Sequence, residues 1–443
     1  RDDDLQILIV PLAKNCYYSG IPEEEATRRT IIRYNKRKNP MLVREMIRNV
    51  YKECKGVPKS NCLTKEQRLS LQMDEFMNRR YEFRYNTQIG EVEYRERFSF
   101  RFYFHPIDKR AQNSIMLDAQ SEGIGVWDRD IDRYLHSNRV PIYNPLEEFL
   151  FHLPHWDGKD RIHALANRVP CNNPHWELLF HRWFLNMVSH WRGVNKMYAN
   201  STSPILVGAQ GTHKSTFCRE MIPPALRAYY TDSIDFSQKR DAELYLNRFA
   251  LINIDEFDQI TLTQQGFLKH ILQKPVVNLR KPHGRSVLEL QRYASFIGTS
   301  NQKDLLTDPS GSRRFICIEV TGNIDTTQPI DYEQLYAQAM HEISHGERYW
   351  FNSEDEQIMT ENNREFEQTP AMLQLFYQYF RAPQAGEEGE FFTPVEILNY
   401  LKKKSGISLS DNKVYHFGRM LQKCGITSKH TYKGTVYQVV KIL

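Results

Sequence analysis

The sequence predicts an α/β core that is preceded by a helical N-terminal region and followed by a winged-helix-like C-terminal domain. Three apolar segments with polar residues directly after them predict the core. Residues 204–207 run into a glycine-bearing turn, residues 249–254 precede two acidic residues, and residues 295–300 precede Asn301. Because open α/β sheets bind ligands at the carboxyl ends of their strands, we expect these three ends to form one site.

The turn after the first segment has the pattern of a phosphate-binding loop. We expect its backbone N–H groups to surround a β-phosphate, Lys214 to reach the β- and γ-phosphate oxygens, and Ser215 to hold Mg²⁺. His213 stands where the pattern has glycine. Histidine is among the non-glycine residues enriched at positive φ, so the loop is strained rather than forbidden. The residues expected to bind the nucleotide are Gly208, Gln210, Gly211, Thr212, His213, Lys214, Ser215 and Thr216.

The polar residues after the other two segments supply the remaining parts of a nucleotide-hydrolysing site. Asp255 would hold the Mg²⁺ shell, and Glu256 would polarise the attacking water. Asn301 is suited to orienting that water, and Arg313 and Arg314 offer guanidinium groups. The order and spacing of these elements predict hydrolysis of ATP with Mg²⁺.

The composition argues against several other classes of protein. The chain has 443 residues, which predicts two to four domains, and its 40% hydrophobic and 26% charged residues are typical of a globular protein. No apolar run approaches the roughly 18 residues of a membrane span, so no membrane partner is expected. Seven scattered cysteines without CxxC spacing indicate reduced thiols in the cytoplasm rather than a zinc site or disulfides.

The core is expected to comprise residues 171–350, and the sequence on either side of it divides into further regions. Residues 1–80 are expected to be helical, and their basic stretch is either a solvated face or a surface that follows nucleic-acid phosphates. Residues 81–170 are expected to connect this region to the core through a β-hairpin around Gly90 and short helices. Residues 351–385 are predicted to form a helical linker.

Residues 386–443 are predicted to form the winged-helix-like domain. Two helices are expected before Gly425 and a hairpin after it, with a turn at Lys433. The basic outer face of this domain predicts DNA contacts at Lys413, Arg419 and Lys433. The other interpretation is a helical cap on the core.

A second predicted hairpin lies between the acidic segment and Asn301. Two apolar runs flank a tip that holds Lys281, His283 and Arg285 around Gly284. Such a tip offers donors for phosphate and one ring for stacking on a base, so these residues are expected to bind single-stranded DNA. The alternative is a surface hairpin with solvated charges.

On these motifs the chain resembles the virulence-associated protein E family, which comprises ATPases of phages and mobile elements related to superfamily 3 replicative helicases. The resemblance covers about residues 140–350, and residues 5–56 resemble a primase C-terminal helical domain. The matching segments are residues 154–162, the phosphate loop, and residues 254–256, 279–285, 296–301 and 308–315.

The resemblance implies an AAA+-like core that assembles into a homo-oligomeric ring, hexameric or similar. It implies an arginine finger at Arg313 or Arg314, a sensing role for Asn301, and a hairpin that carries single-stranded DNA through a central channel. Because successive side chains of a strand-like run point to opposite faces, only one arginine is expected to reach a neighbour, and we favour Arg313. Family members often carry a primase-type domain further upstream, so a primase is a candidate partner.

The expected function is therefore that of an ATP-dependent DNA helicase or translocase that replicates a phage or mobile genetic element. Single-stranded and duplex DNA are the expected partners. One alternative is an ATP-gated loader or defence switch that binds DNA without processive unwinding. Another is a DNA-binding regulator whose phosphate loop is weakened by His213. Processive strand separation distinguishes the first alternative, and DNA-stimulated hydrolysis excludes the second.

Overall fold

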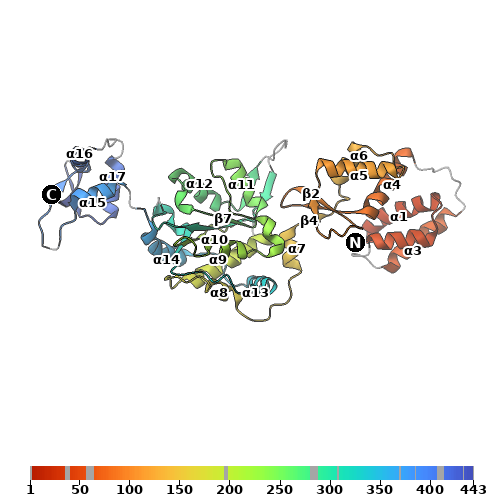
Figure 1. The fold of residues 1–443 in the computed structure, drawn as a ribbon, viewed down its shortest axis with the longest axis horizontal. Coiled ribbons are helices and arrows are strands. Elements are labelled where there is room, and N and C mark those ends of the chain that lie inside the picture. Colours follow the sequence, from red (N-terminus) through yellow and green to blue (C-terminus); the bar gives the residue numbers. More distant parts are fainter. Residues whose placement is uncertain are drawn as a thin grey trace. The chain divides into compact units, whose positions relative to one another are not determined.

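The computed structural model divides the chain into two compact units, Arg1–Pro145 and Leu146–Leu443 (Figure 1). Each unit is described by itself. The structure describes residues 2–34, 40–55, 64–193, 198–279, 288–306, 309–368, 371–384, 386–406, 414–432 and 434–442.

The first unit begins with helices, as the sequence predicts for residues 5–56. Three glutamates occupy the first turn of the second helix, where the helix dipole favours negative charge. Ile9, Val43 and Ile47 are buried among the first three helices. The fourth helix, which falls in a segment expected to be a linker or a loosely packed helix, has a complete capping box between Thr64 and Gln67. The helices are α1 (Asp2–Tyr18), α2 (Glu23–Tyr34), α3 (Pro40–Cys54) and α4 (Lys65–Arg80).

A small sheet completes the first unit. β1 (Tyr81–Asn86) and β2 (Glu91–Glu96) form the predicted antiparallel hairpin around Gly90, whose φ is 71°. β3 and β4 extend it in the order β3-β2-β1-β4. Its apolar face packs with α4 and two further helices in a core that includes Phe83 and Ile131. The added elements are β3 (His105–Pro106), β4 (Ile142–Tyr143), α5 (Lys109–Ser121) and α6 (Asp128–Leu135).

A five-stranded sheet forms the centre of the second unit, in the order β11-β5-β10-β7-β6. All neighbouring strands are parallel. Nearly every residue of its four longer strands is buried, because helices cover both faces. The strands are β5 (Ser203–Val207), β6 (Tyr230–Thr231), β7 (Leu251–Ile254), β10 (Ser295–Ser300) and β11 (Phe315–Glu319).

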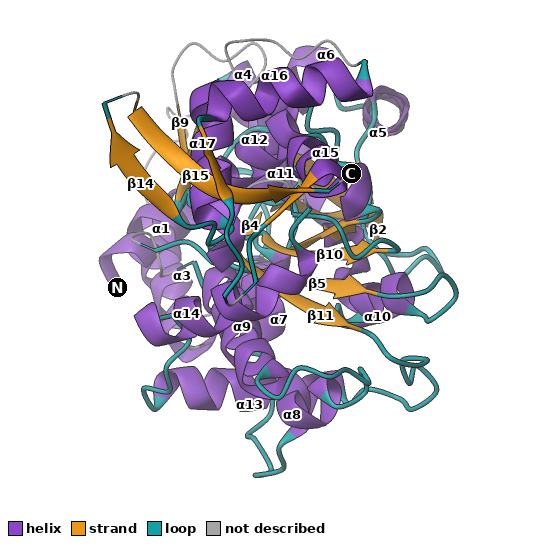
Figure 2. Ribbon diagram, turned by 90° about the vertical axis from the view of Figure 1, so that its left-hand side faces the viewer, coloured by secondary structure: helices purple, strands orange, loops and turns teal. Residues whose placement is uncertain are grey.

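Helices pack on the two faces of this sheet (Figures 1 and 2). α9 lies with α8 and α13 on one face, where Trp183 and Trp191 are fully buried. α12 packs on the other face, where Leu268 and Ile271 share a core with the strands. The helices are α7 (Pro145–Phe151), α8 (Arg161–Ala166), α9 (Trp176–Trp191), α10 (Lys214–Glu220), α11 (Lys239–Arg248), α12 (Leu262–Leu272), α13 (Tyr332–Ser344) and α14 (Ser353–Asn363). The single 3₁₀ turns are η1 (Pro224–Tyr229), η2 (Phe257–Gln259), η3 (Pro309–Arg314) and η4 (Arg364–Phe366).

A two-stranded hairpin leaves the sheet layer between α12 and β10. β8 (Val276–Leu279) and β9 (Leu288–Gln291) pair antiparallel, as the two apolar runs predict. Directly after β9, Arg292 is fully buried and donates to five backbone carbonyls. These carbonyls belong to Ile271 and Leu272 at the end of α12, to Lys274 shortly before β8, to Ala294 directly before β10, and to Asn200. A guanidinium buried without a carboxylate is tolerated here because each of its three nitrogens donates to at least one carbonyl. We call this contact the Arg292 clamp.

The C-terminal segment forms its own small core around Phe376, Leu401 and Phe417. β15 is the central strand of its sheet. Its second half pairs with β13 and β12, and its first half pairs with β14. α15 and β12 lie in the segment predicted to be a linker, and both contribute to this core. The elements are α15 (Ala371–Tyr379), β12 (Phe380–Arg381), β13 (Glu390–Phe392), α16 (Pro394–Ser405), α17 (Val414–Lys423), β14 (Ser428–Thr431) and β15 (Gly434–Lys441). Within the described parts of the chain, the helices are too short or too polar to cross a membrane.

His190, on α9, predicts how the stability of the second unit depends on pH. Its Nε2 accepts a hydrogen bond from the Asn200 backbone at 2.7 Å, which requires a neutral ring. Burial, reinforced by the positive charge of Arg292, lowers the pKa of His190 to about 3 from 6.5. Between these values the unfolded chain binds a proton that the folded chain does not. Stability should therefore be complete above pH 6.5 and fall as the pH decreases towards 3, by up to about 1.4 kcal/mol per pH unit.

This dependence can be measured by urea unfolding at several pH values, followed through tryptophan fluorescence. Trp183 and Trp191 are buried on the same helix as His190, so they report on its surroundings. A His190→Gln variant keeps an acceptor for Asn200 but does not titrate, and its stability should change less with pH over this range. Identical pH profiles for the parent and the variant would show that His190 does not carry the effect.

Candidate nucleotide-binding site

The glycine-bearing loop after β5 is held close to the neighbouring strands. The Gly208 N–H donates to the Ser300 carbonyl at 3.0 Å, and the Val320 N–H donates to the Val207 carbonyl at 2.7 Å. A Cβ at Gly208 would lie 2.9 Å from the Val320 carbonyl oxygen, so only glycine fits there. The sheet therefore fixes the start of the predicted phosphate-binding loop.

His213 takes the left-handed conformation that this position requires. Its φ is 65° and its ψ is 21°, and Gly211 two residues earlier has a φ of 86°. The His213 carbonyl accepts from the Phe217 N–H at 2.9 Å and so opens α10. A left-handed residue with a Cβ costs on the order of 1–2 kcal/mol, which glycine would not incur. The loop keeps its shape despite the histidine, and the imidazole lies on the exposed surface.

Lys214, the first residue of α10, turns its side chain back into the loop. Its Nζ donates to the Gly208 and Ala209 carbonyls at 2.7 Å and lies 3.3 Å from the Asn301 Oδ1. The side chain is buried, and burial lowers its pKa while the nearby Asp255 carboxylate opposes that shift. The ammonium group is thus positioned between the loop and the end of β10.

Ser215 and Asp255, predicted as metal ligands, meet at the carboxyl edge of the sheet. The Ser215 hydroxyl donates to the Asp255 Oδ1 at 3.0 Å, and the Thr299 hydroxyl donates to the same oxygen. One carboxylate and one hydroxyl suit Mg²⁺, which is usually held by few protein ligands together with water and substrate phosphates. Larger groups of His, Cys, Asp or Glu suited to a metal do not occur among the described residues. The donor set therefore fits a magnesium ion that comes with a nucleotide.

Glu256 lies next to Asp255 in a strained backbone conformation. Its φ is 53° and its ψ is 50°, and its side chain is exposed. Non-glycine residues in this region cost about 1–3 kcal/mol and are concentrated at functional sites. Glu256 lines a cavity of about 180 Å³ together with Asp255 and Gln259. The carboxylate therefore lies free at the mouth of the site.

Two residues that the sequence analysis did not select shape this edge. Thr299 contacts Asp255, and Asp258 accepts from the Ser300 hydroxyl at 2.8 Å and from the Asn301 N–H at 3.4 Å. Thr299 and Asn301 are two residues apart, so strand alternation places them on one face. Thr299 could have been selected from the sequence because of this spacing. Asp258 could not, because its contacts depend on the conformation of the turn after β7.

Arg313 and Arg314 lie at the opposite edge of the sheet from the phosphate-binding loop. They precede β11, whose first residue Phe315 is paired with Ser203 at the start of parallel β5. A five-residue strand of about 3.3 Å per residue therefore separates them from the loop by roughly 16 Å. Arg313 pairs with Glu356 of α14 at 3.0 Å, and Arg314 is partly buried. Neither reaches the site of its own chain.

Of the predicted DNA contacts, the structure describes only Arg419, which is exposed on α17. The others lie outside the described residues: Lys281, His283, Arg285, Lys413 and Lys433. Among the predicted nucleotide contacts, Gln210 and Thr216 are exposed on the loop and on the first turn of α10, and Thr212 is partly buried.

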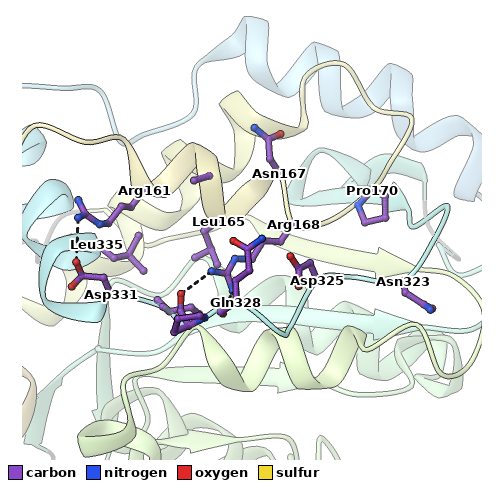
Figure 3. Close-up of a pocket in the computed structure, with 13 residues that line it drawn as sticks. Arg161, Leu165, Asn167, Arg168, Pro170, Asn323, Asp325, Gln328, Asp331 and Leu335 are labelled. Carbon is purple, nitrogen blue, oxygen red and sulfur yellow. Dashed lines mark hydrogen bonds and ion pairs between the residues drawn. The ribbon is translucent and has the colours of Figure 1, made fainter.

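A larger cavity of about 420 Å³ adjoins the loop (Figure 3). It lies between α8 with the turn that follows it and residues 323–335. Arg168 donates to the Gln328 carbonyl at 2.8 Å, and Arg161 pairs with Asp331 at 3.1 Å. The Ile324 N–H donates to the Thr212 carbonyl at 3.1 Å, which joins the cavity wall to the phosphate-binding loop. No local pattern in the sequence indicates this cavity, because its two walls are some 160 residues apart.

Comparison with protein families and solved structures yields the following likenesses. The family described as virulence-associated protein E-like domain matches residues 150–368. A second family, described as a domain of unknown function from B. Theta (DUF3874), matches residues 369–439. No curated protein matches the chain.

Two apo structures of the NrS-1 C-terminal region (305–718) are among the similar solved structures. One is 12% identical, covers 84% of this chain and 99% of its own, and has a TM-score of 0.43. The second, an A form, is 10% identical, covers 85% and 99%, and has a TM-score of 0.42.

Proposed function

Because residues 150–368 belong to the virulence-associated protein E-like domain family, we propose that this chain is a Mg²⁺-dependent ATPase that moves along DNA as a helicase or translocase. The DNA would be that of a replicating phage or mobile element. One observation carries the proposal: Lys214, Ser215, Asp255 and Asn301 converge through hydrogen bonds at the carboxyl edge of one parallel sheet. Convergence from three separate strands is what phosphate binding and hydrolysis need.

Each residue has a distinct task in the proposed reaction. The N–H groups of the loop and the Lys214 ammonium would bind the β- and γ-phosphates in place of the Gly208 and Ala209 carbonyls that Lys214 now contacts. Ser215 and Asp255 would hold Mg²⁺, which neutralises charge that develops on the phosphates. Glu256 would accept a proton from the attacking water, and Asn301 would orient that water against the γ-phosphate.

The cavity of about 420 Å³ is the proposed place for the nucleoside. It begins where Ile324 contacts Thr212 of the phosphate-binding loop, and its walls offer apolar surface from Leu165 and Leu335. Ligand pockets commonly combine such apolar surface with a few polar groups. Asn323 and Asp325 supply polar groups near the loop.

The sheet order and the arginines support an AAA+-like core that works as an oligomer. β5, which carries the loop, lies between β11 and β10 rather than at an edge. Arg313 directly precedes β11 at the edge away from the loop and is half exposed, so in the proposed oligomer it would serve a neighbouring copy rather than its own chain. A homo-oligomeric ring, hexameric or similar, would bring each Arg313 to the next nucleotide.

The parts proposed to bind DNA are the β8–β9 hairpin and the C-terminal segment. α15, β13, α16, α17 and the β14–β15 hairpin follow one another in the order of a winged helix, with β15 between β13 and β14. Residues 386–443 hold nine Lys or Arg and five Asp or Glu, an excess of positive charge that suits a polyanionic partner. In this arrangement α17, which carries Arg419, would be the helix that approaches the duplex.

The Arg292 clamp supports coupling between the hairpin and the ATP site. It binds the carbonyls of Lys274 before β8 and of Ala294 before β10. β10 ends at the nucleotide, where Ser300 and Asn301 contact Asp258. A change at the γ-phosphate would therefore act on a strand whose other end is fastened to the base of the hairpin.

The double variant Lys281→Ala/His283→Ala tests whether the hairpin moves the protein along DNA. Basal ATP hydrolysis should remain near that of the parent, since these residues are proposed to bind DNA and not the nucleotide, while DNA stimulation and unwinding should be lost. Each phosphate contact on a single strand contributes about −0.7 to the slope of log affinity against log salt, so the slope should become shallower. Strand displacement, hydrolysis and salt-dependent DNA binding provide the three measurements.

Arg227→Ala is a suitable control, because it removes an exposed charge from η1 and should change none of these quantities. A double variant that unwinds DNA like the parent would remove the main support for translocation. If the parent hydrolyses ATP with DNA but does not separate strands processively, a loader or switch explains the site better. If the parent binds DNA but does not hydrolyse ATP, the chain is a DNA-binding regulator with a weakened phosphate loop.

A further inference from the structure

The loop between β2 and β3 exposes aromatic side chains to an unusual degree. Phe98, Phe100, Phe102 and Tyr103 have 86%, 94%, 76% and 64% of their surface exposed. All four lie within six consecutive residues, and we call residues 97–104 the aromatic loop. Contiguous apolar surface of this kind is rare on a soluble protein unless it binds something.

The exposed rings are not needed to hold the aromatic loop in place. Arg95 fastens its backbone by donating to the Phe102 carbonyl at 2.9 Å, and Arg97 donates to the Asn78 carbonyl at 2.7 Å. Phe104, which ends the loop, lies under the guanidinium groups of Arg84 at 4.0 Å and Arg95 at 4.8 Å. The core beneath is made of other residues. Tyr103 contacts the His105 ring edge-on, with 4.5 Å between the ring centroids, whereas the rings of Phe98, Phe100 and Phe102 contribute little to holding the fold.

Charge near the loop favours a polyanion. Arg95 and Arg97 share the single carboxylate of Glu82. Arg101 is exposed and has no ion pair among the described residues. The other acidic residue directly beside the loop is Glu96. Residues 1–145 hold 26 Lys or Arg and 21 Asp or Glu, so the whole net charge of +5 belongs to this unit.

We propose that the aromatic loop binds single-stranded nucleic acid by stacking unpaired bases on its exposed rings. Bases of a duplex are stacked on each other and offer only their edges, whereas an unpaired strand offers flat faces to aromatic side chains. Arg101 lies between Phe100 and Phe102 in sequence, Arg97 directly precedes Phe98, and both would contact phosphates. This site does not depend on ATP hydrolysis and lies in a different unit from the nucleotide site.

The test uses the full chain without nucleotide and compares two labelled ligands by fluorescence anisotropy. One is oligo-dT, and the other is an abasic oligonucleotide of equal length and charge. The parent should prefer oligo-dT. The variant Phe98→Ala/Phe100→Ala/Phe102→Ala should bind oligo-dT at least about tenfold more weakly and lose most of the preference, because each stacked base contributes about that factor or more.

Matched variants separate stacking from charge. Trp127→Ala, which removes another exposed aromatic ring of the same unit, should bind like the parent. Arg101→Gln should keep the preference for oligo-dT and make the salt slope shallower by about 0.7. Phe100→Trp should report directly, since stacked bases should quench its fluorescence while the abasic strand should not.

Because the replaced rings are exposed, the triple variant should melt like the parent. The proposal fails if that variant binds oligo-dT like the parent, or if the parent binds both ligands equally. It also fails if the triple variant loses self-association seen by light scattering while its DNA binding is unchanged, since the loop would then be a protein interface. None of these results would bear on the proposed ATPase activity, because basal hydrolysis is measured separately.

Discussion

Glu256→Gln should bind ATP as the parent does and hydrolyse it about 10²–10⁴-fold more slowly, the usual contribution of a general base. The amide keeps the size of the side chain but cannot accept the proton of the attacking water. Its exposed position beside Asp255, held by a left-handed backbone, leaves the carboxylate free for that task. Steady-state phosphate release and equilibrium binding of a fluorescent ATP analogue measure the two quantities separately.

Lys214→Ala should fail one step earlier, at binding. The Lys214 ammonium is the cation at the centre of the loop, within 2.7 Å of two of its carbonyls.

His213→Gly relieves the left-handed strain at the neighbouring position and should leave hydrolysis unchanged or raise it. A large loss there would mean that the imidazole contacts phosphate.

Glu354→Gln provides the matched control for Glu256→Gln. It makes the same chemical change at an exposed residue in the first turn of α14, and it should retain the parental rate. Hydrolysis by Glu256→Gln at the parental rate would exclude the water-activating role and leave Glu256 without a task.

Arg313→Ala should reduce hydrolysis by about 10³–10⁵-fold while the nucleotide site of each chain stays intact, because such a finger stabilises charge in the transition state. Arg313 lies at the amino edge of the sheet, roughly 16 Å from the loop of its own chain, so it would act on a neighbour. Its present partner Glu356 is also partly exposed, and exposed ion pairs contribute only about 0–1 kcal/mol, so releasing the arginine costs little.

Mixing two inactive variants tests this sharing. An Arg313→Ala subunit still offers an intact loop, and a Lys214→Ala subunit still offers an intact arginine, so some interfaces of a mixed ring would hold both. Hydrolysis should partly recover on mixing. Arg314→Ala, measured alongside, shows which of the two arginines is needed. If rings form at every mixing ratio but activity never returns, the site is not shared between subunits.

The sequence was informative where one local pattern determines the outcome. The apolar strands and their polar ends were readable because buried parallel strands are continuously apolar and ligand sites follow them. The amphipathic helix of residues 176–191 was readable from its period. The β8–β9 strands were readable as two apolar runs around a glycine.

Features that depend on distant contacts could not be predicted. The position of β5 between β11 and β10 comes from crossovers that leave no trace in local composition. Asp258 meets Ser300 across 42 residues, and Arg168 meets Gln328 across 160 residues. Nothing in the local sequence marks Arg292 as a buried residue, yet it is fully buried.

That buried arginine determines where the hairpin is able to bend. Each nitrogen of this buried guanidinium donates to a backbone carbonyl, so the root of the hairpin is held to α12, to Asn200 and to the residue before β10. Any movement of the hairpin in the proposed ATPase cycle would therefore have to begin beyond Arg292, within β8 and β9. Adding one residue pair to each of these strands would then lengthen that movement without changing the rate at which ATP is split.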